Sequence, residues 1–160
     1  MTFERTRDYE LIRSIMSHRR IYPFITDDLC PAVEDFRPAH SDAIWYMLAK
    51  DEGDLLGMWI FVPQNGICWE VHTCLLPVGW GERGARAARE LAGWVWQHTE
   101  CRRIITNVPE CNRLALRFAM RAGMETFGRN KQSFLKSGKV HDQIMLGLSR
   151  PEEGEQCQQQ

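Results

Sequence analysis

Along the first half of the chain, short runs rich in apolar residues stand between polar turn sequences, as is typical of β-strands. These runs predict strands at residues 2–5, 43–50, 55–62 and 69–75, and side chains alternate with a period of two along the last of them. Two short turns, residues 51–54 (DEGD) and 64–66 (QNG), separate the last three of these strands. We therefore expect those three strands to form an antiparallel meander.

The period changes between the first two strands. Residues 7–20 carry apolar side chains at helical spacing, which predicts a helix with Thr6 as its N-cap. Residues 21–38 contain three prolines and no sustained period, so we expect a loop with one helical turn. Such a segment either walls a substrate site or only packs against the fold.

The stretch 69–96 reads as a strand, a glycine-rich turn and a helix. Within the strand, Glu70, His72 and Cys74 fall on one face, and the apolar residues fall on the other. Pro77 ends the strand, glycines follow, and helical spacing begins at Ala85. A glycine-rich turn that opens a helix leaves N–H groups unpaired at the positive end of the helix dipole. This pattern predicts a phosphate cradle, although many such units are purely structural.

The spacing of the glycines excludes two common nucleotide-binding classes. The chain has no GxxxxGK[ST] sequence and no GxGxxG followed by an acidic ribose partner. We therefore do not expect a nucleoside triphosphatase or a dinucleotide-dependent dehydrogenase.

The second half of the chain predicts a strand at 102–108, a helix at 111–122 that stops at Gly123, and strands from 124 and at 141–148. Arg113, Arg117 and Arg121 share one face of the helix, which is either solvated or in contact with phosphate. Residues 149–160 are polar and glutamine-rich, and we expect a disordered tail there. Residues 1–148 are then one domain.

Composition narrows the function classes. The 160 residues carry a net charge of −1, so a general attraction to nucleic acid is not expected. The N-terminus lacks the apolar core of a signal peptide, and no run is long enough to span a membrane, which favours a cytoplasmic location. The six cysteines are scattered and do not combine with the histidines in a zinc spacing, so we expect reduced thiols and no metal.

Two segments carry a resemblance to the GNAT superfamily of acyl-CoA-dependent N-acyltransferases. LLPVGWGERGA, at 75–85, resembles the family's strand end and pyrophosphate loop, and NRLALRFAMRAGM, at 112–124, is similar to the helix that flanks the pantetheine arm. The ending GKVHDQIMLGL resembles the last hairpin of the ribosomal-protein N-terminal acetyltransferases. The chain as a whole is most similar to GNAT-like proteins of tailed phages and prophages. The resemblance implies a single α/β (α+β) domain, with a mixed, mostly antiparallel sheet of six to seven strands flanked by helices.

The resemblance also implies acetyl-CoA as co-substrate and an amine as acceptor, either a small molecule or a protein. The residues expected to hold the cofactor are Leu75, Trp80, Gly81, Arg83, Gly84, Ala85 and Asn112. Aligning Pro77 with the family proline puts Trp80 at an Arg/Gln position and Arg83 at a glycine position. A shift by one residue keeps Gly84 instead, so the register of the loop stays open.

Glu70 and His72 are the candidate bases, since they lie upstream of the cradle where a base acting through water is often found in this family. The alternative is that both only satisfy hydrogen bonds beneath a helix layer. The family's usual tyrosine, a proton donor to the departing thiolate, falls at Ala119. This departure and Arg83 together support a second hypothesis: a catalytically degenerate phage protein that acts in virion assembly or DNA delivery. The partners would then be virion proteins, and a homodimer is possible under either hypothesis.

Overall fold

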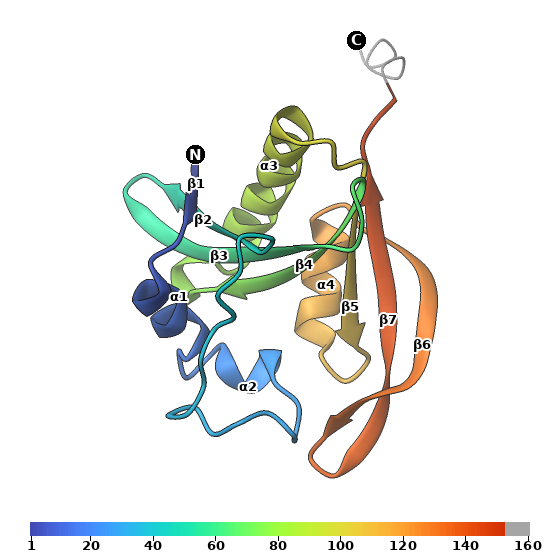
Figure 1. Cartoon of the computed structure of the whole chain (residues 1–160). Coiled ribbons are helices and arrows are strands. Elements are labelled where there is room, and N and C mark those ends of the chain that lie inside the picture. Colours follow the sequence, from blue (N-terminus) through green and yellow to red (C-terminus); the bar gives the residue numbers. More distant parts are fainter. Residues whose placement is uncertain (153–160) are drawn as a thin grey trace.

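Seven strands form one mixed sheet in the order β1-β2-β3-β4-β5-β7-β6 (Figure 1). The computed structural model describes residues 1–152. The strands are β1 (Thr2–Thr6), β2 (Trp45–Asp51), β3 (Asp54–Pro63), β4 (Cys68–Leu75), β5 (Arg103–Pro109), β6 (Glu125–Lys136) and β7 (Lys139–Ser149). The helices are α1 (Tyr9–Met16), α2 (Tyr22–Ile25), the 3₁₀ turn η1 (Pro77–Gly79), α3 (Glu82–His98) and α4 (Arg113–Arg121). The predicted fold class, a mostly antiparallel sheet of six to seven strands flanked by helices, is confirmed.

The predicted meander is present. β2 pairs antiparallel with β3, and β3 pairs antiparallel with β4, while β1 adds to the outer edge of β2. The alternation of side chains along these strands sends successive residues to opposite faces of the sheet. Because consecutive residues of β2 and β3 are apolar and buried, both faces of the meander are apolar. Both faces must therefore be shielded from water by other elements.

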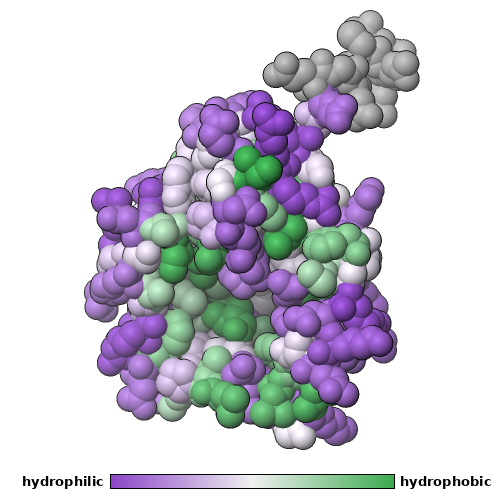
Figure 2. Space-filling view, turned by 45° about the vertical axis from the view of Figure 1, so that its right-hand side comes forward, coloured by the Kyte–Doolittle hydropathy of each residue, from purple (hydrophilic) through white to green (hydrophobic). Residues whose placement is uncertain are grey.

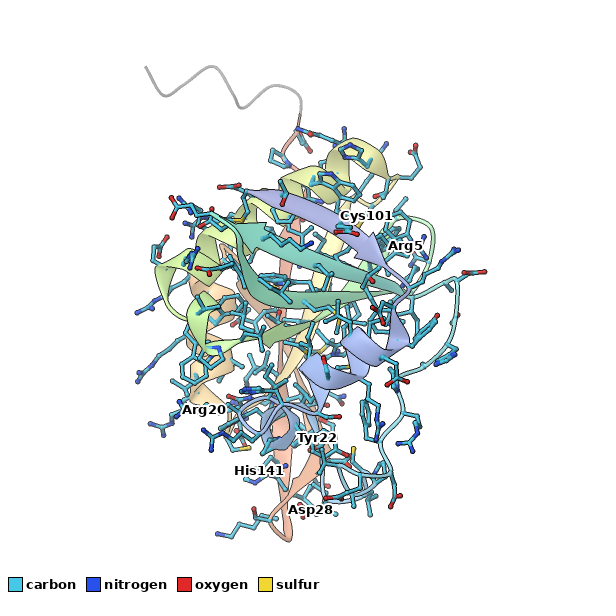
Figure 3. The ribbon with its side chains drawn as sticks, turned by 90° about the vertical axis from the view of Figure 1, so that its left-hand side faces the viewer. Arg5, Arg20, Tyr22, Asp28, Cys101 and His141 are labelled. Carbon is cyan, nitrogen blue, oxygen red and sulfur yellow. The ribbon has the colours of Figure 1, made fainter. Side chains whose placement is uncertain are left out.

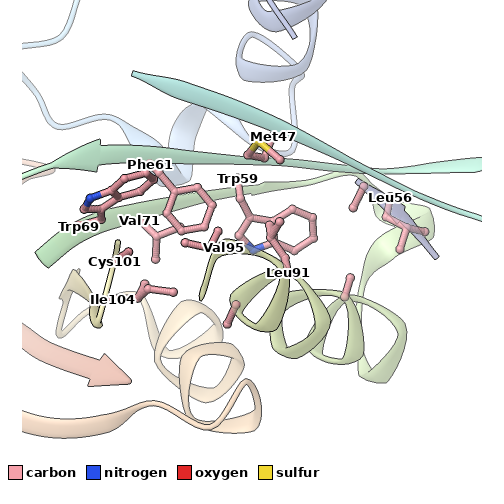
Figure 4. Close-up of a cluster of buried hydrophobic side chains, with 13 residues drawn as sticks. Met47, Leu56, Trp59, Phe61, Trp69, Val71, Leu91, Val95, Cys101 and Ile104 are labelled. Atoms are coloured by element: carbon pink, nitrogen blue, oxygen red, sulfur yellow. The ribbon is translucent and has the colours of Figure 1, made fainter. Parts of the chain in front are cut away.

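Helix α3 covers one face of the sheet and helix α1 covers the other. Trp59, Phe61 and Val71 pack against Leu91 and Val95 of α3 (Figure 4). Their neighbours in sequence face the opposite way, and this second cluster includes Ile12 and Ile15 of α1 together with Tyr46, Leu48, Met58, Ile60 and Cys74. Helix α4 lies on the α3 face, where Ala119 packs with Val108 and Leu146. The sheet is thus the middle layer of three.

Helix α1 is shorter than the predicted helix at 7–20. Its N-cap is Asp8, whose carboxylate accepts a hydrogen bond from the Leu11 N–H at 3.0 Å. Thr6, the predicted cap, instead ends β1 and accepts a bond from the Asp8 N–H. Asp is a stronger cap than Thr, and a residue paired in a strand is not available to start a helix.

The C-terminal hairpin is longer than predicted. β6 and β7 pair from Lys136–Lys139 to Glu125–Gly147, with irregularities between Thr126 and Gly128 and between Asn130 and Phe134. Residues 125–136 are largely exposed and polar, so their period of two carries no hydrophobic signal. β7 also continues through Ser149, which pairs with Arg103. The Arg150 N–H donates to the Arg102 carbonyl oxygen at 2.8 Å, and residues 153–160 of the predicted tail lie outside the described residues.

The only parallel pair in the described sheet joins β4 to β5, and it is short. Three residue pairs connect the two strands, from Cys68–Arg103 to Glu70–Ile105. Beyond Glu70 the strands diverge, which is visible in Figure 1. A parallel pair requires a crossover connection, and α3 provides it. The divergence leaves an opening through the middle layer of the molecule.

Helix α3 approaches the end of β4 closely because residue 84 has no side chain. A Cβ atom at Gly84 would lie 2.2 Å from the Gly79 carbonyl oxygen and 2.8 Å from Leu75 Cδ1. We therefore expect Gly84→Ala to lower the free energy of unfolding by about 1–3 kcal/mol through overpacking.

Gly93 is the matched control, since it lies in the same helix and a Cβ there would meet nothing within 4 Å. We expect Gly93→Ala to be neutral or to stabilise by up to about 1 kcal/mol, because Ala favours the helix. Denaturant titration of both variants measures the difference, and equal stabilities would show that this close approach is not tight.

Candidate functional site

A cavity of about 910 Å³ occupies the opening between β4 and β5. Residues from both covering layers line it, including Ile21 and Phe24 on the α1–α2 side and Leu91 and Phe118 on the α3–α4 side. The cavity therefore passes through the sheet. Its surface is mainly apolar, and the space-filling view shows a hollow with apolar surface at its centre (Figure 2).

Glu70 lies in this cavity where the two strands part. Its carboxylate accepts one hydrogen bond from Gln64 Nε2 at 3.0 Å and another from Asn107 Nδ2 at 3.1 Å. Gln64 belongs to the turn before β4, and Asn107 lies on β5. The side chain is 18% exposed, so the two amides fix a carboxylate that still reaches the cavity. Each oxygen has a second lone pair, which leaves room for an ammonium donor.

His72 lies beside Glu70 on the same face of β4. Its Nε2 is 3.8 Å from Glu70 Oε1, and its side chain is 49% exposed. Both residues line the cavity. The two predicted bases are therefore brought together, with the carboxylate held firmly and the imidazole open to solvent. An imidazole in contact with water can pass a proton between the cavity and the outside.

The N-terminus of α3 opens on the same cavity. Gly81 is the N-cap with φ +78°, and no side chain caps the helix. The N–H groups of the first turn have no partner within the helix, and such groups can donate to an anion. Trp80 and Gly81 line the cavity, and the Trp80 indole donates to the Leu75 carbonyl oxygen at 3.1 Å. Ala85 is buried where α3 begins to pack on the sheet.

The Arg83 side chain points away from the cavity. Its guanidinium binds the Asp51 carboxylate and carbonyl, and it also binds Asp54 at 2.7 Å. Arg86 donates to the same Asp51 oxygen at 2.7 Å. These bonds, with the Arg83 bond foremost, hold the pKa of Asp51 below its ordinary value. The guanidinium of Arg83 thus ties α3 to the turn between β2 and β3, and Arg83 does not line the cavity.

Helix α4 forms another wall. Asn112 is the N-cap of α4, and its side-chain oxygen accepts a hydrogen bond from the Ala115 N–H at 3.1 Å. Asn112 also lines the cavity. The cap uses the side-chain oxygen, so the amide N–H groups remain for a ligand. Ala119 lines the cavity about two turns further along. Its methyl group offers no proton.

Two other titratable groups in the lining are held in their neutral form. Burial raises the pKa of the Cys74 thiol to about 12, and burial also raises the pKa of Tyr46. The Tyr46 hydroxyl donates to the Ala39 carbonyl oxygen at 2.8 Å. A thiol with so high a pKa is a poor nucleophile at neutral pH. Within residues 1–152, no group of three His, Cys, Asp or Glu side chains is placed to hold a metal ion. No helix of that part of the chain has the length and apolarity needed to cross a lipid bilayer.

Solved structures share this architecture. A spermidine N-acetyltransferase from Vibrio cholerae, in complex with CoA and spermine, matches with a TM-score of 0.73 at 15% identity, over 92% of this chain and 94% of that one. A ribosomal-protein-alanine N-acetyltransferase from Brucella melitensis matches with a TM-score of 0.67 at 15% identity, over 94% and 100% of the chains. A GNAT-family acetyltransferase from Bacillus anthracis gives 0.56 at 17% identity, over 67% and 66%. This chain has the GNAT fold. No protein-family model matches it, and no curated protein matches its sequence.

Several residues that line the cavity of this GNAT fold could not be predicted from sequence patterns. Asn107 is the most important, because it bonds Glu70 across the opening. In the sequence, Asn107 is a single amide side chain within a strand that is otherwise largely apolar. Nothing in that pattern indicates that it bonds Glu70, which lies 37 residues earlier. Asp142, in the first half of β7, instead serves the hairpin by accepting bonds from Arg129 and from the Gln132 N–H.

A strap of hydrogen bonds joins residues 26–28, just after α2, to residues 135–138 at the tip of the β6–β7 hairpin. The Asp28 carboxylate accepts bonds from the Ser137 and Gly138 N–H groups at 2.9 and 2.7 Å. Lys136 Nζ donates to the Thr26 carbonyl at 2.6 Å, and the Asp28 N–H donates to the Leu135 carbonyl. Figure 3 shows Asp28 beside the hairpin. The predicted loop at 21–38, with its one helical turn, therefore walls the cavity together with the hairpin.

The strap yields a pH-dependent prediction. The N–H groups of Gly138 and Ser137 hold the pKa of Asp28 below its ordinary value. A carboxylate with a lowered pKa contributes its stabilisation above the unfolded-state pKa, about 3.9, and loses it as the pH falls through the folded-state value. We expect hydrogen exchange at Ser137 and Gly138 to be slow at neutral pH and to lose protection only at strongly acidic pH.

Asp28→Ala should remove that protection at every pH, because no acceptor remains for the two amides. Asp35→Ala, in the same loop and exposed, is the control and should leave exchange at the hairpin unchanged. Parental exchange rates in the Asp28→Ala variant would contradict the strap.

Proposed function

We propose that this protein is an N-acetyltransferase that moves an acetyl group from acetyl-CoA to a primary amine. One observation carries the proposal: Glu70, fixed by two amides, lies in a cavity that passes between β4 and β5 beside the uncapped N-terminus of α3. A base, a channel for a thioester and an anion cradle thus meet at one place. The solved neighbours, which are N-acetyltransferases of the same fold, support this reading.

The residues present fit acetyl-CoA. The first turn of α3 offers unpaired N–H groups for a pyrophosphate, and Gly81 at φ +78° brings the backbone there without a side chain. The apolar walls between β4 and α4 suit a pantetheine arm, and the Asn112 amide can donate to one of its carbonyl groups. Arg117 and Arg121 line the same side of the cavity and add positive charge.

When bound, acetyl-CoA supplies an activated acetyl group: the amine nitrogen forms the new C–N bond, the thioester C–S bond breaks, and the thiolate leaves. The chain's own residues prepare the amine. Glu70 attracts an ammonium and takes its proton, directly or through water, because its carboxylate faces the cavity while Gln64 and Asn107 keep it in place. His72 connects this position to solvent and can carry the proton away.

The second candidate function, a GNAT-fold protein without catalysis that serves in phage assembly or DNA delivery, is favoured by Ala119. This residue is buried among apolar neighbours and places no hydroxyl in the cavity. In an active enzyme of this sequence, the departing thiolate would be protonated by solvent. The measurements of acetyl-CoA binding and of acetylation rate described below separate the two functions.

Acetyl-CoA should bind and stabilise the folded protein. A ligand at 100 times its dissociation constant stabilises by about 2.7 kcal/mol, which raises the melting temperature by several degrees. Asn112→Ser keeps an N-cap oxygen and removes the amide, so we expect it to weaken binding by about 1–2 kcal/mol with little change in stability. Calorimetry measures both dissociation constants, and an absence of binding at millimolar acetyl-CoA would remove the acyltransferase proposal.

Glu70→Gln should lower the acetylation rate by about 10²-fold or more while acetyl-CoA binding is retained, because a correctly positioned general base accelerates a reaction by at least that factor. The variant keeps shape and loses only the charge. Glu90→Gln, on the exposed face of α3, is the matched control and should be as active as the parent.

His72→Gln separates the two bases. If His72 relays the proton, its loss should lower the rate less than the loss of Glu70 and should alter the acid limb of the pH–rate profile. Full activity in both variants would show that this face of β4 supplies no base.

A further inference from the structure

The charges in the cavity are unbalanced in a way that restricts the acceptor. Among residues 1–152, Glu70 is the only carboxylate in the lining, whereas the cationic side chains there are Arg20, Arg37, Arg117 and Arg121. Both oxygens of Glu70 already accept one amide hydrogen bond each. The cavity therefore offers one anionic position, and it lies where β4 and β5 part.

The arginines on the α1–α2 side are held in place. Arg37 donates to the carbonyl oxygens of Glu34 and Phe36, and Arg20 lies over the Trp80 ring, with its Cζ 5.5 Å from the ring centroid. A second ammonium on the acceptor would meet these cations and no carboxylate. An unpaired charge in an apolar, partly enclosed site is costly to desolvate.

The wall of the cavity on the acceptor side is apolar and rich in aromatic rings. Phe24 on α2, Phe36 in the following loop and Phe134 on β6 all line it, together with Met16 and Ile25. Phe24 is 57% exposed, so its ring is accessible to an apolar group of a ligand in the cavity. Rings of this kind bind an apolar body by contact area and edge-to-face packing.

The strap holds the segments that carry two of these rings. Four hydrogen bonds join residues 26–28 to residues 135–138, so Phe24 and Phe134 belong to segments that are tied to one another. A cavity of about 910 Å³ that also takes the pantetheine arm leaves room for a small acceptor.

We propose that the acceptor is a small primary monoamine with an apolar or aromatic body, whose single ammonium pairs with Glu70 and whose body contacts Phe24, Phe36 and Phe134. This inference rests on the proposed function and names its substrate class. It separates this protein from the Vibrio cholerae neighbour, whose structure contains spermine, a molecule with several amines.

The test compares amines with the full chain and acetyl-CoA. We expect kcat/KM for 2-phenylethylamine or tryptamine to exceed that for spermidine by about 100-fold or more, since a buried polar or charged group without a partner is rejected strongly. Phe134→Ala should lower kcat/KM for 2-phenylethylamine about 10-fold, mainly through KM. Phe127→Ala, on the same strand but outside the lining, is the matched control and should not change it.

A charge exchange provides the second arm. Gln143 lines the cavity, and Gln143→Glu adds one carboxylate with almost no change in shape. We expect this variant to raise the ratio of spermidine to 2-phenylethylamine turnover at least 10-fold. Gln97→Glu, which adds the same charge on the outer face of α3, should leave the ratio unchanged.

Binding without turnover keeps the substrate class and the proposed function distinguishable. In the presence of CoA, 2-phenylethylamine should raise the melting temperature and spermidine should not. If acetyl-CoA binds but spermidine, or a peptide with an apolar N-terminus, is acetylated as well as the monoamines or better, the monoamine inference is wrong while the acyltransferase proposal stands. If acetyl-CoA binds and no monoamine either reacts or shifts the melting temperature, the monoamine inference also fails. If acetyl-CoA does not bind, the proposed function itself is lost.

Discussion

Parallel pairing between β4 and β5 lasts for only three residue pairs, and the geometry of the site depends on where it stops. Up to Glu70 the two strands hold one another by backbone hydrogen bonds. Beyond it, each strand follows the twist imposed by its other neighbour, β3 on one side and β7 on the other. The backbone groups that face the gap are left without a strand partner, which is acceptable only where water or a ligand can reach them. The opening is therefore both a break in the sheet and the channel of the candidate site.

The same break explains why Glu70 is held by side chains from both sides of the opening. Gln64 precedes β4 and Asn107 lies on β5, and their amides approach the carboxylate at the point of divergence. Two neutral donors fix the carboxylate without cancelling its charge, whereas an arginine in either place would have formed an ion pair. The arginines near the start of α3 form ion pairs away from Glu70, as Arg83 and Arg86 do with Asp51.

Much of this fold follows from local patterns in the sequence. Short-range signals predict the meander and the turn and helix that follow it. These signals are the apolar runs of β2 and β3, the alternation along β4, the turn sequences between these strands and the glycines before α3. Two kinds of feature could not be predicted from local patterns: residues whose partners lie far away in the sequence, and strands that are mostly polar. Asn107 gains its role only when β5 lies beside β4, and the polar β6 reveals itself only through pairing with β7. Arg83 belongs to a segment that resembles a phosphate loop, yet Asp51 and Asp54 attract its side chain across the turn.

The strap also has a consequence for the order of events during synthesis. Its bonds join residues separated by about 110 positions, such as Asp28 and Gly138 or Thr26 and Lys136. A ribosome that adds about 5–20 residues per second needs roughly 5–20 s to cover that distance. During this interval Phe24 and its loop have no hairpin to hold them, and the meander and α3 are synthesised before the hairpin is. The four bonds of the strap can therefore form only after nearly all of the described chain has been made.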